Sequence, residues 1–139
     1  MLNPRPRQFR KPNKKIIRKT YENKSNRIRF GDFGLQSLSF GFFTSQQIEA
    51  IRRTITGRLK RKARIWIRSY PDYPRTAKPK EVRMGRGKGN VDHWSCYVKP
   101  GRILFEVKSK DILILKDALN FSKRKLPFPA QVIGRTLSL

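Results

Sequence analysis

The chain has 139 residues, of which 34 are Lys or Arg and nine are Asp or Glu, so its formal net charge is +25. This length suits a single domain with one modest core, and such a charge opposes compaction unless a polyanion neutralises it, which makes nucleic acid the expected partner. Nine Phe, four Tyr and two Trp exclude a wholly disordered basic tail, and no apolar run is long enough to predict a membrane span.

Residues 1–29 contain eleven basic residues and a single acid, Glu22, with few apolar residues at helical spacing. Pro4, Pro6 and Pro12 would interrupt a helix, because proline lacks the amide hydrogen and crowds the preceding turn. We therefore predict an extended basic arm over residues 1–29, followed by a single domain over residues 30–139. The arm is expected to contact RNA, and a solvated tail is the alternative.

The segment Phe30–Leu38 mixes aromatic residues with two glycines, which predicts a turn leading into a strand. Packing of its aromatic residues in the core is the favoured interpretation, because alternating Phe and Leu around glycines is typical of strand entry. Stacking of these rings on nucleic-acid bases is the alternative.

A first helix is predicted to begin at Thr44-Ser45-Gln46-Gln47, which has the form of a capping box. Ile48, Ile51, Ile55 and Leu59 then recur at steps of three and four and form one apolar stripe. The other faces carry basic residues that we expect to contact phosphate: Arg52, Arg53, Arg58, Lys60 and Arg61.

The segment Ile65–Tyr70 alternates with period two and predicts a half-buried strand closed by Pro71, after which a proline-rich loop follows. Two further strands are predicted over Trp94–Lys99 and Arg102–Val107. The turn signal Lys99-Pro100-Gly101 between them favours pairing of the two as a hairpin.

A second helix is predicted after Asp111, which can cap it, and the helix ends in cationic residues before Pro127. A last strand is predicted over Ala130–Arg135. The fold class is therefore α+β, with two helices packed on one face of a mainly antiparallel sheet.

Catalysis is not indicated, because the residues it needs are missing. The chain has one histidine, His93, and one cysteine, Cys96, and its acids are scattered singly. This excludes paired carboxylates and cysteine-based metal clusters as patterns, so we expect no catalytic residues, no metal and no cofactor. A free-standing nucleic-acid-binding or RNA-modifying protein is the alternative to a structural RNA-binding role.

The run Val82–Asn90 alternates glycine with basic residues but matches neither the phosphate-binding loop nor the dinucleotide fingerprint. Glycines allow close backbone approach and positive φ angles, while the cations between them supply donors to phosphate oxygens. We predict an RNA-binding loop that uses Arg83, Met84, Gly85, Arg86, Gly87, Lys88 and Gly89. A surface loop without a ligand is the alternative.

With these segments in place, nearly the whole chain resembles the bacterial-type universal large-subunit ribosomal protein sixteen family. The resemblance is carried by Met1-Leu2 with Pro4, Phe9-Arg10-Lys11, Phe30-Gly31, Phe33-Gly34-Leu35, Gln47-Ile48-Glu49-Ala50, Arg52-Arg53, Ile65-Trp66-Ile67-Arg68, Pro71-Asp72 with Pro74 and Thr76, Lys78-Pro79, Val82–Asn90, and Lys99-Pro100-Gly101 with Glu106.

The resemblance implies an α+β sandwich that binds large-subunit rRNA near the base of the central protuberance, close to the aminoacyl-tRNA site and the peptidyl-transferase centre. The implied partners are large-subunit rRNA, tRNA at or near the aminoacyl site, and neighbouring large-subunit ribosomal proteins. In that family the glycine-rich loop and the arm reach toward the functional core. The resemblance therefore adds the arm residues Arg5, Arg7, Arg10 and Lys11 to the loop as expected RNA contacts.

The expected location is a mitochondrial ribosome, with a plastid ribosome or the bacterial cytoplasm as alternatives. The run Glu81–Asn90 is most similar to mitochondrially encoded members of the family. The chain starts where family members start, so we expect it to be made in the compartment where it works.

Overall fold

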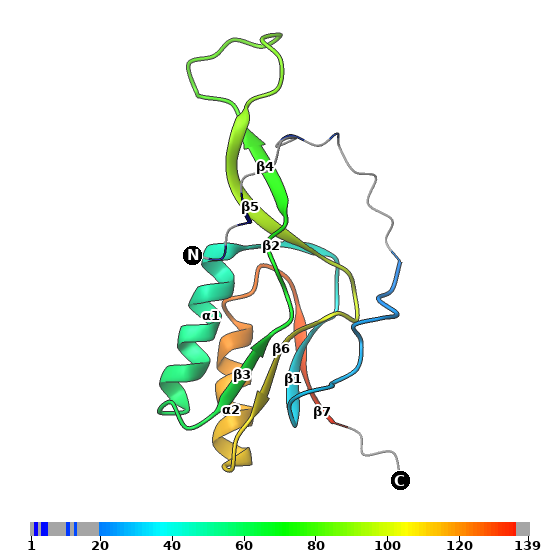
Figure 1. Cartoon of the computed structure of the whole chain (residues 1–139), viewed down its shortest axis with the longest axis vertical. Helices are drawn as coiled ribbons and strands as arrows, with labels where there is room; N and C mark the ends of the chain where they lie inside the picture. Colours follow the sequence, from blue (N-terminus) through cyan, green and yellow to red (C-terminus); the bar gives the residue numbers. More distant parts are fainter. Residues whose placement is uncertain (1, 3, 6–10, 12, 14–19, 136–139) are drawn as a thin grey trace.

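The computed structural model describes residues 2, 4, 5, 11, 13 and 20–135. This part of the chain forms two helices and seven strands (Figure 1), which confirms the predicted α+β class. In chain order they are β1 (Phe33–Ser37), β2 (Gly41–Thr44), α1 (Ser45–Arg58), β3 (Arg64–Ile67), β4 (Tyr73–Ala77), β5 (Asn90–Val98), β6 (Ile103–Lys108), α2 (Ile112–Lys123) and β7 (Ala130–Gly134). Neither helix in these residues is long and apolar enough to cross a membrane.

Helix α1 begins where the sequence predicts. The Thr44 hydroxyl oxygen accepts the Gln47 amide at 3.3 Å, and the Gln47 side-chain oxygen accepts the Thr44 amide at 3.0 Å, which completes the capping box. The predicted apolar stripe is buried from Ile48 to Leu59. The helix therefore presents one face to the core and leaves its basic residues on the others.

Helix α2 also begins after the predicted residue, but Asp111 makes no side-chain capping hydrogen bond. Leu115, Ala118 and Leu119 are fully buried. In the first turn, by contrast, Ile112 is more than half exposed. Only the second and third turns of α2 therefore pack against the rest of the domain.

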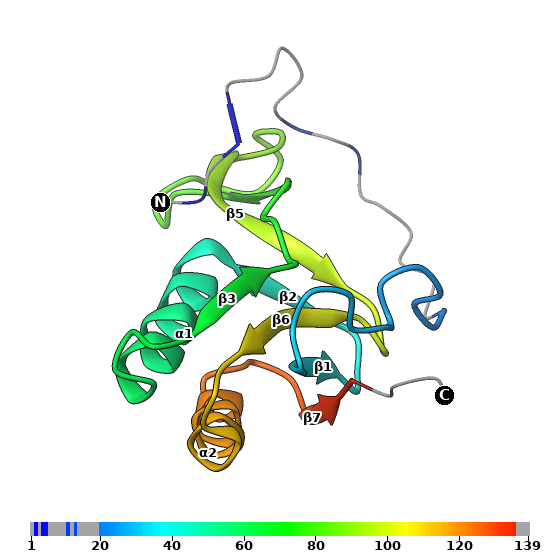
Figure 2. The same ribbon diagram turned by 60° about the horizontal axis from the view of Figure 1, so that its bottom comes forward.

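The strands form two separate antiparallel sheets rather than one. The first has the order β3-β6-β1-β7 and the second the order β2-β5-β4. Helices α1 and α2 lie side by side on one face of the four-stranded sheet, as Figure 2 shows. The core fills the space between them, with Phe43 and Phe105 in edge-to-face contact at 6.1 Å between ring centroids.

The predicted hairpin between Trp94–Lys99 and Arg102–Val107 is wrong. The Arg102 amide donates to the Lys99 carbonyl at 3.2 Å, so a turn does form. However, β5 pairs with β2 and β4, whereas β6 pairs with β1 and β3. The turn therefore connects the two sheets.

Two strands were not predicted, and both are edge strands of the three-stranded sheet. The proline-rich loop contains β4, in which Pro74 lies opposite Trp94. Proline is tolerated at a sheet edge, since the hydrogen bond it cannot donate is not needed on the open side. Strand β2 likewise pairs on one side only, with β5.

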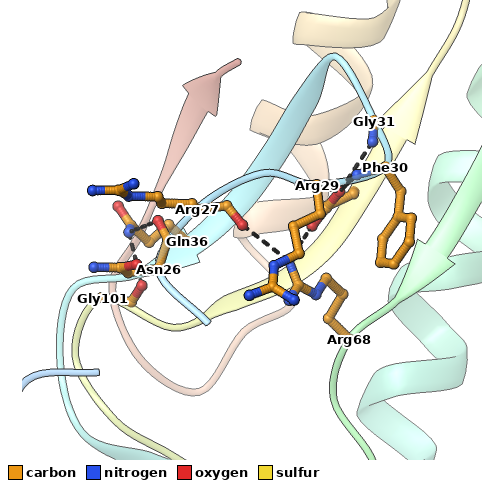
Figure 3. Close-up of polar contacts among 9 residues, drawn as sticks. Asn26, Arg27, Arg29, Phe30, Gly31, Gln36, Arg68 and Gly101 are labelled. Atoms are coloured by element: carbon orange, nitrogen blue, oxygen red, sulfur yellow. Dashed lines mark hydrogen bonds and ion pairs between the residues drawn. The ribbon is translucent and has the colours of Figure 1, made fainter. Parts of the chain in front are cut away.

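Residues 22–29 have no regular secondary structure but are bonded to the domain. The Glu22 amide donates to the Pro100 carbonyl at 2.9 Å, and the Ile103 amide donates to the Ser25 carbonyl at 2.9 Å. The Gln36 side chain bonds the carbonyls of Asn26 and Gly101 (Figure 3). The division into an arm over residues 1–29 and a domain over residues 30–139 stays a prediction.

Candidate nucleic-acid interface

The glycine-rich segment lies at the tip of a hairpin. Strands β4 and β5 pair along their length and extend beyond the rest of the molecule, and residues 78–89, called here the hairpin loop, join them at the top of Figure 1. Residues 78–88 are all exposed, and Met84 is 98% exposed. The fold therefore presents the predicted loop residues together on a projecting element.

Glycine is required in the hairpin loop for two different reasons. Gly85 and Gly87 have φ angles of 89° and 74°, in the left-handed region that other residues rarely adopt. At Gly89 a Cβ atom would lie 2.1 Å from the carbonyl oxygen of Ala77, so only glycine allows this approach of the two strands. Both uses of glycine expected from the sequence are present.

The hairpin loop carries five cations, including Lys78 and Lys80 at its start. Arg83, Arg86 and Lys88 are exposed and have no acid between them, and Glu81 is the one acid in residues 78–89. Exposed guanidinium groups on a glycine-rich backbone can form charge-assisted hydrogen bonds with phosphate oxygens. The geometry therefore suits a polyanion rather than a small neutral ligand.

The described part of the arm contacts the same hairpin where its loop joins β5. The Lys11 ammonium donates to the side-chain oxygen of Asn90, the first residue of β5, at 3.0 Å. Arg5 is exposed. Arg7 and Arg10 lie outside the described residues. Lys11 is thus the one predicted arm residue that these contacts bring next to the hairpin loop.

Two of the predicted basic residues of α1 are paired with an acid inside the chain. Arg52 and Arg53 both bond the Glu49 carboxylate, at 2.6 and 3.1 Å. The Arg52 hydrogen bond, with help from Arg53, lowers the pKa of Glu49 to about 2, and Glu49 in turn raises the pKa of Arg52. One negative charge therefore offsets part of the positive charge that the sequence placed on this face.

The remaining predicted cations lie at the C-terminal end of α1. Arg58 pairs with Asp117 of α2 at 2.7 Å and covers the ring of Phe121 at 3.7 Å. Lys60 and Arg61 follow with positive φ angles of 48° and 63° in the turn before β3. This end of α1 points away from the hairpin loop (Figure 1). The predicted site is therefore split between two distant parts of the surface.

One buried charge was not predicted at all. Glu106 of β6 is 0% exposed, and one of its oxygens accepts the amides of Arg29, Phe30 and Gly31 at 3.1, 2.6 and 3.0 Å. Arg68 pairs with the other oxygen, and Figure 3 shows its guanidinium directed to the same place as these amides. Burial raises the pKa of Glu106, but these hydrogen bonds outweigh it, so the pKa lies below its ordinary value.

Phe30 contradicts the prediction that the aromatic residues of this segment pack in the core. Its backbone is fixed by Glu106, yet its side chain is 54% exposed. Its ring stacks on Trp66 of β3, with centroids 6.1 Å apart and planes at 21°. No sequence pattern signals this pair, because the two residues are brought together only by the folding of residues 29–31 over the sheet.

Other candidate chemistry is not assembled in the described residues. Burial raises the pKa of the Cys96 thiol, which disfavours the reactive thiolate. His93 is exposed on β5 and bonds the neighbouring Asp92 at 2.7 Å. No group of three or more His, Cys, Asp or Glu side chains in this part of the chain could hold a metal ion.

Comparison with known proteins gives one consistent result. The family model described as ribosomal protein L16p/L10e matches residues 4–133. The chain is 46% identical over 138 residues to the large ribosomal subunit protein uL16 of Psychrobacter cryohalolentis, with 99% of both chains covered. The proteins of the same name from Chelativorans sp. and Pseudoalteromonas atlantica are 47% and 43% identical, and at least 97% of each chain is covered.

Proposed function

The chain belongs to the family of ribosomal proteins L16p/L10e, and from this we propose that it is a structural constituent of the large ribosomal subunit. Its role is to bind and position RNA, and it performs no catalytic step itself. Neighbouring large-subunit proteins and large-subunit rRNA are its partners. The net charge of +25 supports a partner that is itself a polyanion.

The observation that carries this proposal is the projecting, exposed hairpin loop with its five cations and one acid. A narrow hairpin can enter between RNA strands, where a flat surface could not. Its glycines have no side chains that would obstruct close approach of the backbone to RNA, and Arg83, Arg86 and Lys88 supply hydrogen-bond donors to phosphate. The hairpin loop is therefore proposed to reach into folded rRNA near the base of the central protuberance.

The finer part of the proposal concerns tRNA. The hairpin loop and the basic arm are proposed to approach the aminoacyl-tRNA site, close to the peptidyl-transferase centre. The Lys11–Asn90 hydrogen bond supports a joint role for the two segments, because it brings an arm cation to the residue that directly follows the hairpin loop. The cations of α1 are proposed to contact rRNA elsewhere, since they lie on another part of the surface.

Sedimentation of cell extracts in moderate salt tests the coarse proposal. A ribosomal constituent sediments with the large subunit, whereas a free-standing nucleic-acid-binding or RNA-modifying protein stays near the top of the gradient. A density map of the intact particle then tests the finer proposal. If residues 83–89 faced solvent far from bound tRNA, the assignment to the aminoacyl site would fall and membership of the subunit would stand.

The compartment is proposed separately. The sequence of residues 81–90 favours a mitochondrial ribosome, while the relatives named above support a bacterial one as the alternative. Immunodetection of the chain in ribosomes from purified mitochondria supports the mitochondrial proposal, whereas its detection in ribosomes from a bacterial extract supports the alternative.

A further inference from the structure

A second basic site lies on the face of the four-stranded sheet that the helices do not cover. Ile65 and Ile67 of β3 pack against the core, so the alternating residues Arg64 and Trp66 point to the opposite face. There a groove of about 680 Å³ opens between residues 61–64, Trp66, residues 108–110 and Phe30. It is separate from the hairpin loop.

The lining of this groove, called here the basic groove, is strongly cationic. It includes five basic residues and no acid, namely Arg61, Lys62, Arg64, Lys108 and Lys110. All five are exposed, and none forms an ion pair with an acid of the described residues. Arg64 and Lys108 are direct partners across β3 and β6. Like charges at such paired positions repel, and an anion between them would relieve the repulsion.

The basic groove also presents an aromatic surface. One side of Phe30 is stacked on Trp66, and the side chain is still 54% exposed. The Phe30 amide is held by Glu106 at 2.6 Å, so the ring is presented from a fixed backbone. A fixed exposed ring beside several cations is the combination that binds single-stranded nucleic acid, by stacking for the base and charge for the phosphates.

We propose that the basic groove binds an unpaired nucleotide of RNA, with its base against Phe30 and its flanking phosphates between Arg64 and Lys108. The proposal rests on the proposed function only in taking ribosomal RNA as the natural ligand. Paired RNA is not the ligand, because the stacked bases of a duplex would not expose a face to Phe30.

The test uses the full chain with Trp94→Phe, which leaves Trp66 as its single tryptophan. The probe is an oligoadenylate about eight nucleotides long, within the usual site size for single-stranded binding. The rest of this basic chain also binds RNA, so the Trp66 fluorescence isolates events in the basic groove. We expect the oligoadenylate to quench it, and inorganic polyphosphate of equal charge to cause much less quenching.

Phe30→Leu is the decisive variant, because leucine keeps apolar bulk over Trp66 but offers no aromatic face. The oligoadenylate concentration at half-maximal quenching should rise by about tenfold, the order of magnitude of one base–aromatic contact. Phe30→Tyr should restore the original value. Tyr70→Ala, which removes an exposed aromatic side chain outside the basic groove, should leave it unchanged.

Charge is tested by Lys108→Gln with Lys110→Gln, against Lys116→Gln with Lys123→Gln on α2 as a control of equal charge. The first pair should raise the half-maximal concentration several-fold more than the second. Circular dichroism checks that each variant is folded.

The proposal would be overturned if Phe30→Leu and Phe30→Tyr had the same oligoadenylate concentration at half-maximal quenching. It would also be overturned if polyphosphate quenched the Trp66 fluorescence as strongly as the oligoadenylate, because that would mean phosphate binding without a stacked base. Neither result would change the expectation that the chain sediments with the large subunit. Conversely, a chain that failed to sediment with the subunit would refute the proposed function even if the basic groove bound the oligoadenylate.

Discussion

The guanidinium of Arg68 pairs with the carboxylate of Glu106 inside the fold, where the two side chains are 13% and 0% exposed. Three consecutive backbone amides, from Arg29 to Gly31, bond the same carboxylate. One buried charge thereby fixes the entry of the chain into β1 and the position of Phe30 over Trp66.

Replacement of this carboxylate should destabilise the domain strongly. Glu106→Gln removes the charge that pairs with Arg68 and weakens the bonds to the three amides. We expect a loss of about 3 kcal/mol in the free energy of unfolding, as for other broken buried ion pairs. Urea denaturation of the isolated chain measures it. Glu49→Gln, which breaks a partly exposed pair, is the control and should cost less than about 1 kcal/mol.

The same group should make stability depend on acid pH. The pKa of Glu106 in the fold lies below its ordinary value of 4.5, so its stabilising contribution is complete above that value and is lost as the pH falls through the lowered pKa. The difference in unfolding free energy between the natural chain and Glu106→Gln should therefore be constant above about pH 5.5 and shrink below about pH 4.5. A difference that did not change on acidification would contradict this account of Glu106.

The two predicted N-cap residues, Thr44 and Asp111, should contribute different amounts to the free energy of unfolding. Thr44→Ala removes a hydrogen bond that exists and should cost about 1 kcal/mol. Asp111 makes no such bond, so Asp111→Ala loses only its interaction with the helix dipole, roughly 0.3 kcal/mol. Thermal or urea unfolding of the two variants side by side is the measurement, and equal losses would show that Asp111 caps α2 after all.

Arg83→Ala combined with Arg86→Ala should spare the fold and impair the ribosome. Both side chains are exposed at the tip of the hairpin, so the free energy of unfolding should change by less than about 0.5 kcal/mol. When the logarithm of the binding constant for large-subunit rRNA is plotted against the logarithm of the salt concentration, the steepness of the slope should fall by about one for each phosphate that the variant no longer neutralises. Late maturation of the subunit or tRNA accommodation should slow.

Lys123→Ala with Arg124→Ala is the control for the hairpin-loop variant, because it removes the same charge from the end of α2. It should leave subunit maturation and tRNA accommodation near normal. Normal subunits and normal translation in the Arg83 and Arg86 double variant would count against the proposed role of the hairpin loop.

Helices and their buried faces were predictable because the information is local. The capping residues Thr44 and Gln47 are three positions apart, and the stripe from Ile48 to Leu59 spans little more than three turns. Strand pairing is not local. The turn at Lys99-Pro100-Gly101 has the sequence of a hairpin, yet its flanking strands enter different sheets because their partners, β1 to β4, lie earlier in the chain.

The candidate site likewise has features that were predictable from the sequence and features that depend on the tertiary structure. The sequence by itself determined a glycine-rich basic loop within residues 82–90 and an excess of cations that favours a polyanionic partner. Only the tertiary structure showed that β4 and β5 flank this loop and make it the tip of a projecting hairpin. Only the tertiary structure decided which cations stay available. It paired Arg58 with Asp117 of α2, and it brought Phe30, Trp66 and Lys108 together around one groove. The pairs of Arg52 and Arg53 with Glu49 are different, because they form between neighbouring turns of α1 itself. The physical reason is that ion pairs and grooves depend on distances in space, which residues remote in sequence acquire only when the buried Glu106 and the core hold their segments together.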